Sequence, residues 1–414
     1  MTLVFCVILV ALVFEYINGF HDTANAIATS VATKVMTPAQ AIALASVMNL
    51  VGAMTSVSVA KTIGQGLVDT GHITSLAIMC SLLGAIAWNL FTWWIGLPSS
   101  SSHALIGGLC GAALAAAHNS WKAIKWVETK TVVIREFIPA TPDIAGSLNL
   151  AALAPGTNTL MHAGQPLTVV VPADSASPLL METIKTVVLH GGVWHKVIKP
   201  MFAAPLCGLA VGFILMGLLL VLFRGFRPRV VNQVFGKAQL LSAAWMSFEH
   251  GRNDAQKTMG IIALTLFAAT TQSRDFVNLP DWLGFLRTPE FTIPFWVKIT
   301  CAMTIAAGTA AGGWKIIKTM GKNVVKMQPV HGFAAQTTAA AVIGVASHLG
   351  IPLSTTHVIS GAIMGVGSTK RLNAVKWSVA ERMVWAWIFT IPISGLIAYV
   401  LMRVSQWNGL LGGH

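Results

Sequence analysis

Two short polar segments lie inside long apolar stretches of the chain. The first, Asn18–Asn25, has the sequence NGFHDTAN, and the second, Glu249–Lys257, has the sequence EHGRNDAQK. In each segment a glycine precedes an aspartate by three residues, and these aspartates, Asp22 and Asp254, lie 232 positions apart. A carboxylate in the middle of a bilayer costs about 2.5–3.5 kcal/mol on insertion scales, so it is retained where it faces a cavity or a partner. The pair indicates a duplicated site, and the glycines predict that both helices open there.

Two hydroxyl-rich segments form a second duplicated pattern. Ser99–Ser102 follows Pro98, and Ser354–Thr356 lies two positions after Pro352. Proline favours the first turn of a helix, so each segment predicts a helix that begins inside a cavity. A helix N-terminus offers unpaired N–H groups and about half a positive charge, which suits an anion. The alternative is that the serines only cap helices or allow close helix packing.

The composition is that of a polytopic α-helical membrane protein. Of the 414 residues, 55% are hydrophobic and 10% are charged, and the mean hydropathy is +0.70. About ten continuous apolar stretches approach the roughly 20 residues that a transmembrane helix needs, whereas a β-barrel would show alternation. The net charge of +13 comes mostly from Lys and Arg in short loops beside apolar segments, so it indicates a lipid bilayer and not nucleic acid as the partner. The five cysteines form no CxxC pair, and they predict neither disulfides nor a metal site.

The motifs divide the chain into two similar membrane repeats, each with a motif helix, a span, a hydroxyl-tipped hairpin and a further span. The predicted boundaries are 1–117 for the first repeat, 118–200 for an extramembrane insert with a strand-like run at Leu167–Val171, 201–223 for the span that closes the first repeat, 224–237 for a basic cytoplasmic loop and 238–414 for the second repeat. If the basic loops are cytoplasmic, the two hairpins enter the membrane from opposite sides. The predicted fold is therefore an all-α polytopic membrane protein with an inverted-topology repeat, two re-entrant helical hairpins and broken motif helices.

These motifs resemble those of the inorganic phosphate transporter (PiT) family. The two family signatures are matched by Gly19–Asn25 and His250–Lys257, and its phosphate-binding hairpins by Ser99–His103 and Ser354–His357. The resemblance covers nearly the whole membrane part but not the insert. It implies a secondary active transporter, not an enzyme, that imports inorganic phosphate by cation symport without a cofactor. It also implies a homodimer that crosses the inner (plasma) membrane several times.

The first signature bears on the coupling cation. Sodium-coupled members of the family usually carry Asn-Asp in both signatures, whereas this chain has His21-Asp22 in the first. In this respect it resembles the bacterial low-affinity, proton-coupled members, which take up phosphate or neutral metal–phosphate. An imidazole nitrogen is a poor sodium ligand, but it titrates near physiological pH. The resemblance therefore predicts protons as the coupling cation, with sodium as the alternative.

The resemblance and the chemistry of phosphate together give the candidate residues. Phosphate is a hydrated anion, so several N–H and O–H donors must replace its water. The predicted phosphate-binding residues are Ser99, Ser100, Ser101, Ser102, Gln256, Lys257, Ser354, Thr355 and Thr356, and the predicted coupling-ion residues are His21, Asp22, Asn25, Asn253 and Asp254. No bound metal is predicted. Lys257 lies three residues after Asp254 on the same helical face, so it contacts phosphate or neutralises Asp254.

Three other functions remain open at this point. A sulfate or other oxyanion permease could use the same site, but phosphate offers an O–H group that Asp22 or Asp254 can accept. An intramembrane hydrolase could combine a serine with His103 or His357, but it leaves the duplication unexplained. An anion channel is disfavoured because buried acids would repel the permeant ion.

Overall fold

The structure is a computed structural model that describes residues 1–69, 73–139, 155–162, 165–171, 180–272, 276, 279–369 and 371–408. It divides into two compact units. The helical unit comprises Met1–Trp126 and Gly192–His414, and the strand unit comprises Val127–Gly191. The strand unit is therefore shorter than the insert expected at 118–200, because the flanking segments belong to the helical unit.

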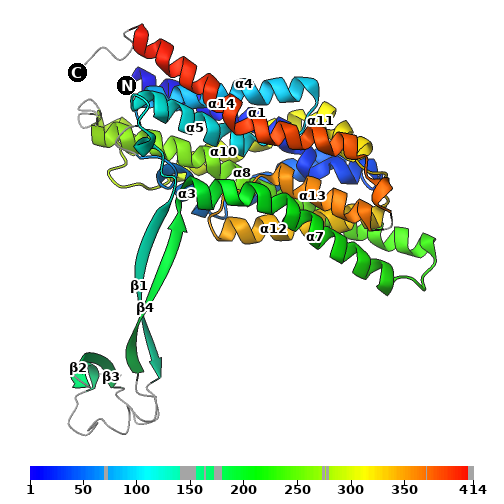
Figure 1. Ribbon diagram of the computed structural model, residues 1–414, viewed down its shortest axis with the longest axis horizontal. Helices are drawn as coiled ribbons and strands as arrows, with labels where there is room; N and C mark the ends of the chain where they lie inside the picture. The colour runs from blue at the N-terminus through cyan, green and yellow to red at the C-terminus, as the bar shows by residue number, and fades with distance from the viewer. Residues whose placement is uncertain are drawn as a thin grey trace. The chain divides into compact units, whose positions relative to one another are not determined.

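The helical unit contains two successions of helices in the same order (Figure 1). The first consists of α1 (Thr2–Ala32), α2 (Pro38–Ala53), α3 (Ser58–Gln65), α4 (Ser75–Ile95), α5 (Ser101–Ala116), a 3-10 helix (Trp121–Ala123), a π-helix (Trp194–Ile198) and α7 (Lys199–Leu222). The second consists of α8 (Pro228–Gln272), a 3-10 helix (Asp281–Leu286), α10 (Phe295–Ala311), α11 (Trp314–Lys318), a π-helix (Thr319–Asn323), α12 (Pro329–His348), α13 (Thr355–Ser368), a 3-10 helix (Leu372–Ala374) and α14 (Trp377–Trp407).

The two halves are intertwined rather than side by side. Helix α1 packs against α10 of the other half, and α8 packs against α2 in the same way. Helices α13 and α7 pack together, as do α14 and α5. Exchanging the two halves therefore maps these contacts onto one another, as expected for a duplicated unit. The inverted orientation of the halves in a bilayer stays a prediction.

The motif helices are not broken, and this part of the fold prediction is wrong. Helix α1 is continuous through Gly19, and α8 is continuous through Gly251. These glycines allow close helix contact instead: a Cβ at Gly19 would lie 2.6 Å from the carbonyl oxygen of Ile305 in α10, and one at Gly251 would collide with the backbone of Asn49 in α2. The bends occur in the following spans, where α2 and α3 meet at 70° and α10 meets the α11 segment at 62°.

Fewer helices can span a membrane alone than the ten or so apolar stretches suggest. In the described residues, four helices are long and apolar enough, and the two bent pairs raise the number to six. The hairpin arms α5 and α13 have only 16 and 14 residues, and the second polar motif interrupts the apolar sequence of α8. Helix α8 also begins at Pro228, so most of the segment expected to be a loop at 224–237 is helical.

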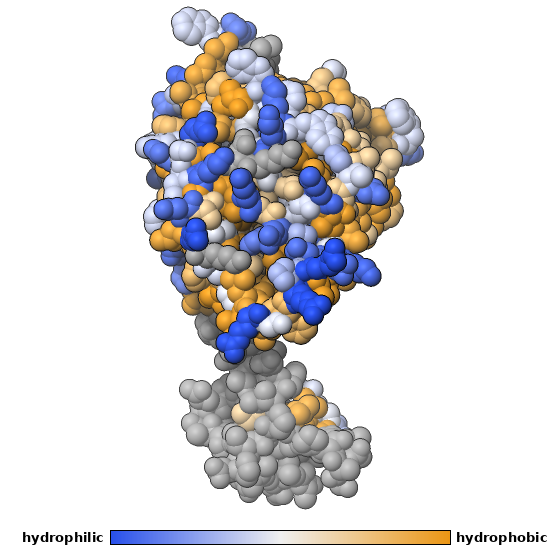
Figure 2. Space-filling model, turned by 90° about the vertical axis from the view of Figure 1, so that its right-hand side faces the viewer, coloured by the Kyte–Doolittle hydropathy of each residue, from blue (hydrophilic) through white to orange (hydrophobic). Residues whose placement is uncertain are grey.

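The basic ends of the helices gather at one end of the helical unit. The α7–α8 turn, α11 and the start of α14 all lie at the right in Figure 1. Viewed from that side, hydrophilic side chains stand out from a largely hydrophobic surface (Figure 2). The exposed cations of these segments include Arg224, Arg227, Lys315, Lys318 and Lys376. That this end faces the cytoplasm stays a prediction from the charge pattern.

The predicted helical hairpins are present, and the same backbone device forms both tips. Gly96 ends α4 with φ +72°, and Gly350, 254 positions later, follows α12 with φ +65°. Glycine adopts this left-handed conformation without the cost that a Cβ imposes. A proline follows each glycine by two residues, and a serine then caps the next helix. The Ser100 hydroxyl accepts from the backbone N–H of His103 at 3.2 Å at the start of α5, and the Ser354 hydroxyl accepts from that of His357 at 3.3 Å at the start of α13.

The strand unit is a four-stranded antiparallel sheet. Its strands are β1 (Glu128–Pro139), β2 (Gly156–His162), β3 (Gln165–Val171) and β4 (Leu180–Gly191), in the order β1-β4-β3-β2. The longest pairing joins β1 to β4, from Glu128 opposite Gly191 to Pro139 opposite Leu180. The strand expected at Leu167–Val171 is confirmed as part of β3.

Candidate functional site

The two motif helices and the two hairpin tips meet in the interior of the helical unit. All fourteen predicted site residues are described, and each is at most 2% exposed. One hydroxyl of the α1 motif bonds within the helix, since Thr23 Oγ1 donates to Gly19 O at 2.6 Å, whereas His21, Asp22 and Asn25 contact side chains of other helices. The buried polar groups of the motif therefore point toward neighbouring helices and not into water.

On the first-hairpin side, His21 joins the motif to the tip of the α4–α5 hairpin. Its Nδ1 lies 2.7 Å from Asp22 Oδ1, and its Nε2 lies 3.1 Å from Thr92 Oγ1. Ser99 Oγ lies 2.8 Å from Thr92 Oγ1 and 3.4 Å from His21 Nε2. The imidazole therefore connects a carboxylate to a hydroxyl pair at the tip. Thr92 was not predicted; only its place one turn before the hairpin tip could have indicated it.

Ser101 links the same carboxylate to an amide. Its Oγ lies 2.6 Å from Asn18 Oδ1 and 2.7 Å from Asp22 Oδ2. A hydroxyl has one proton to donate, so it cannot donate to both oxygens. Both contacts are hydrogen bonds if Asp22 carries a proton and donates it to Ser101 Oγ. They are also both hydrogen bonds if the Asn18 amide is turned over, so that its nitrogen donates to Ser101 Oγ. The hydrogen bonds of this tip thus depend on the protonation of Asp22 or on the orientation of the Asn18 amide.

Each motif helix also reaches the hairpin of the other half. Asn25 Nδ2 in α1 donates to Thr355 Oγ1 at 3.0 Å and to Thr356 Oγ1 at 2.9 Å. Lys257, which occupies the position of Asn25 in the second motif, donates from Nζ to Ser102 Oγ. The motif repeat and the hairpin repeat therefore meet in equivalent pairs, which sequence spacing alone did not predict.

Asp254 and Asn253 complete the second half of the site. Lys257 Nζ lies 2.6 Å from Asp254 Oδ1, and Asn253 Nδ2 donates to the same oxygen at 2.7 Å. Asn253 Nδ2 also donates to Leu353 O at 2.9 Å. Since Ser102 Oγ lies 3.4 Å from that carbonyl, the two hairpin tips touch each other. The site is closed in this conformation.

A carboxylate pair and one imidazole form the arrangement best suited to a cation. One ligand atom each from Asp22, His250 and Asp254 lie within 4.8 Å of one another, and all three residues are buried. His250 Nδ1 lies 3.1 Å from Asn49 Oδ1, while His250 Nε2 and Asp254 Oδ2 lie 3.5 Å from each other without a hydrogen bond to any described residue. Such a group can hold a proton or a metal ion. His250 was not predicted, although it stands in the second motif where Asn18 stands in the first.

Three predicted phosphate-binding residues instead form hydrogen bonds with backbone groups in this conformation. Gln256 Oε1 accepts from Val59 N at 2.8 Å at the start of α3, and its Nε2 donates to Arg252 O at 2.5 Å. The hydroxyls of Ser100 and Ser354 cap the hairpin helices. Their contact with phosphate stays a prediction, and it requires these bonds to change. By contrast, Ser101, Ser102, Thr355 and Thr356 point toward the motif helices.

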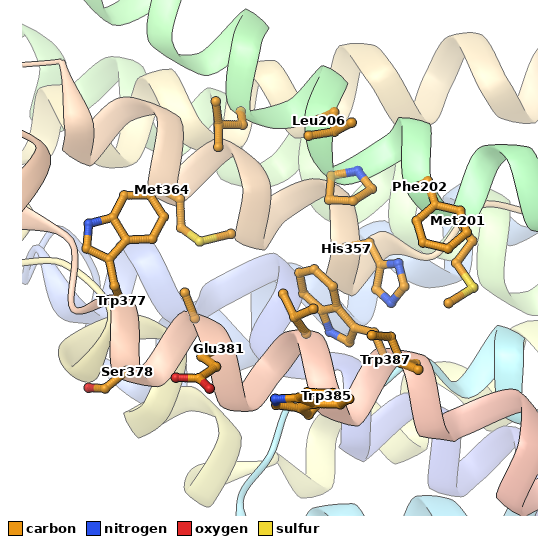
Figure 3. Close-up of a pocket in the computed structure, with 15 residues that line it drawn as sticks. Met201, Phe202, Leu206, His357, Met364, Trp377, Ser378, Glu381, Trp385 and Trp387 are labelled. Atoms are coloured by element: carbon orange, nitrogen blue, oxygen red, sulfur yellow. The ribbon is translucent and has the colours of Figure 1, made fainter.

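A cavity outside this group of polar residues is too apolar to suit phosphate. It measures about 820 Å³ and is bounded by α7, α13 and α14. Its lining is mainly apolar, with three tryptophans, and Glu381 is its one acidic side chain (Figure 3). His357 lines the cavity, and its ring packs at a tilt against that of Trp387. The indole N–H of Trp387 donates to Pro98 O in the first hairpin. A hydrated anion would find few donors there.

Comparison with known proteins gives consistent matches over almost the whole chain. The sequence profile described as the phosphate transporter family matches residues 18–398. A probable low-affinity inorganic phosphate transporter of Bacillus subtilis is 38% identical over 403 residues, covering 96% of each chain. Another protein of that description, from Rhizobium meliloti, is 37% identical and covers 94% of this chain and 93% of its own. A solved structure described as the sodium-dependent phosphate transporter shares the fold, with a TM-score of 0.69 at 19% identity, over 98% of this chain and 100% of its own.

Proposed function

The chain belongs to the phosphate transporter family and is an inorganic phosphate transporter of the membrane, and we propose that it imports phosphate by secondary active transport with protons as the coupling cation. The observation that carries the proposal is the convergence of both hairpin helix N-termini with the buried ammonium of Lys257. These groups offer N–H and O–H donors and positive potential to one anion. In the proposed cycle, phosphate replaces the contacts that now close the site.

Electrostatics explains why the anion must enter with a cation. Two unit charges 4 Å apart interact by about 4 kcal/mol at an effective dielectric constant of 20. An ionised Asp22 or Asp254 at that distance from phosphate would therefore weaken binding roughly 1000-fold, since every 1.4 kcal/mol is tenfold. A cation bound to these carboxylates removes the penalty. Binding of the anion and binding of the cation are then mutually favourable, which is the requirement for symport.

Protons fit the ligand set better than sodium. His21 and His250 place imidazole nitrogens beside Asp22 and Asp254, and imidazoles bind protons in the physiological range. Lys257 already supplies one fixed positive charge beside Asp254. Sodium is the second candidate, because the carboxylates and Asn18 also offer hard oxygen atoms and because a solved structure of this fold is described as sodium-dependent.

Several finer properties belong to the same proposal. The transporter would reside in the inner (plasma) membrane, work as a homodimer and accept phosphate either free or as a neutral metal–phosphate. The Asp22–His250–Asp254 group supports the last point, because two carboxylates and one imidazole suit a divalent ion. Sulfate remains the main alternative substrate, and it lacks the proton that phosphate can donate to a carboxylate.

The test is uptake of radiolabelled phosphate into proteoliposomes with sodium and proton gradients imposed separately. We expect accumulation with an inward proton gradient, undiminished when choline replaces sodium. Excess unlabelled phosphate should compete and excess sulfate should not. Uptake that requires sodium and ignores the proton gradient would contradict the coupling, and equal competition by sulfate would contradict the substrate.

A further inference from the structure

A fully buried acid close to the candidate site has no part in the cycle proposed above. Glu15 lies in α1, seven residues before Asp22, and is 0% exposed. Thr258 of α8 donates a hydrogen bond to its Oε2. Its other oxygen, Oε1, has no hydrogen-bond partner in the part of the chain that the structure describes. Glu15 therefore sits in the protein interior with half of its carboxyl group unsatisfied.

Within the described residues, no cation forms an ion pair with this carboxyl group. The described ion pairs inside the helical unit join other residues, and Lys257 directs its ammonium to Asp254 and Ser102. The titratable groups that face Glu15 are Asp254 and Lys257 from α8 and Cys301 from α10. An unpaired carboxylate inside a membrane protein carries a large free-energy cost, and a bound proton removes it.

Asn18 lies between Glu15 and the hairpin tip, although no hydrogen bond joins its Nδ2 to Glu15 Oε1 in this conformation. Asn18, one helical turn further along α1, lies beside the Glu15 carboxyl group, and its Oδ1 is 2.6 Å from Ser101 Oγ. The Asn18 Nδ2 atom has no partner among the described residues. An amide can donate its N–H to an ionised carboxylate or, turned over, accept from a protonated one. Asn18 can thus satisfy Glu15 in both protonation states.

We propose that Glu15 is a proton-carrying residue of the transport cycle. Its carboxylate takes up one proton from water on the side where phosphate enters, and returns that proton to water on the other side after phosphate leaves. This inference rests on the proposed proton coupling and adds a second proton site to the His21–Asp22 group. The other explanation is purely structural: Glu15 would serve only to tie α1 to α8 through Thr258.

A glutamine separates the two explanations. Glu15→Gln keeps an oxygen that accepts from Thr258, but it cannot exchange a proton. Two assays in proteoliposomes are compared: accumulation of radiolabelled phosphate driven by an inward proton gradient, and exchange of labelled for unlabelled phosphate at equal concentration and pH on both sides. We expect accumulation to fall at least tenfold and exchange, which needs no net proton movement, to stay within twofold of the parent protein.

The matched control is Glu249→Gln in the second motif helix. Glu249 is also buried, but it pairs with Arg252 at 3.5 Å and accepts from Trp245 at 3.3 Å. We expect both assays to be unchanged in this variant. Glu15→Asp, which keeps the titratable group on a shorter side chain, should recover part of the accumulation.

Three results would overturn the inference. Normal accumulation in Glu15→Gln would show that no proton needs to bind there. Equal loss of accumulation and exchange, in a variant with the parent's thermal unfolding midpoint, would assign Glu15 to the architecture of the site. A parent protein that ignores the proton gradient would remove the proposed coupling and this inference with it, whereas the first two results leave the proposed function intact.

Discussion

Replacing Lys257 tests whether its ammonium binds phosphate or only neutralises Asp254. In Lys257→Met the carboxylate of Asp254, 2.6 Å from Nζ in the parent protein, stays buried without its cation. Breaking a buried ion pair in this way costs about 3–5 kcal/mol of stability. If Lys257 also contacts phosphate at about 4 Å, its loss removes a further ~4 kcal/mol from binding at an effective dielectric constant of 20. That corresponds to a Kd roughly 1000-fold higher.

The double variant Lys257→Met/Asp254→Asn separates these two effects. It removes both charges, so most of the lost stability should return, while phosphate should bind more weakly than to Asp254→Asn alone. The measurements are the thermal unfolding midpoint of the purified protein and the Kd for radiolabelled phosphate, arranged as a double-mutant cycle. Phosphate binding as tight in the double variant as in Asp254→Asn alone would refute the reasoning, because both variants lack the Asp254 charge and differ only at Lys257.

Three further predictions concern the acids, the imidazole and the topology. Asp22→Asn and Asp254→Asn should each lower uptake at least a hundredfold while the protein still inserts, measured by proteoliposome transport with membrane-fraction blots as the control; normal uptake in either variant would remove that residue from the mechanism. His21→Asn should flatten the dependence of uptake on external pH, because an amide cannot take up the proton that an imidazole beside Asp22 can accept; an unchanged pH profile would argue against its role. Cysteines at Val188 and Lys318 should react with an impermeant maleimide from opposite sides of the membrane, and reaction from the same side would overturn the inverted topology.

The hairpins and the residues at their tips could be predicted because their signals are local. A glycine, a proline and a run of hydroxyl residues specify a turn and a capped helix within a few positions. The structure places Gly96 and Gly350 in the left-handed conformation and Ser100 and Ser354 at the caps. No information from distant parts of the chain is needed for such elements, and the repetition at a fixed offset strengthened each one.

The continuity of the motif helices could not be predicted in the same way, because glycine has two opposite uses. A glycine next to buried polar residues can open a helix, or it can let another backbone approach. Gly19 lies in α1, but its use for close packing depends on the backbone of Ile305 and Gly308 in α10, nearly 300 positions away in the sequence. The same limit explains why Thr92, Asn49 and His250 were missed: each joins the site through a contact with a distant segment.

The exchanged contacts between the halves suggest how one ligand could control both hairpins. Asn25 holds the second hairpin through Thr355 and Thr356, and Lys257 holds the first through Ser102. The two contacts occupy corresponding positions in the two repeats. A ligand that competes for both sets of hydroxyl groups would therefore weaken the attachment of both hairpins at once. Alternating access requires that the site can open to either side of the membrane at a similar free energy, so two attachments of similar strength suit it. The pairs are not identical, however, because one is a neutral amide and the other an ammonium bound to Asp254. We therefore expect the half that contains Lys257 to respond more strongly to the charge of phosphate, and the half that contains Asn25 to the protonation of its neighbour Asp22.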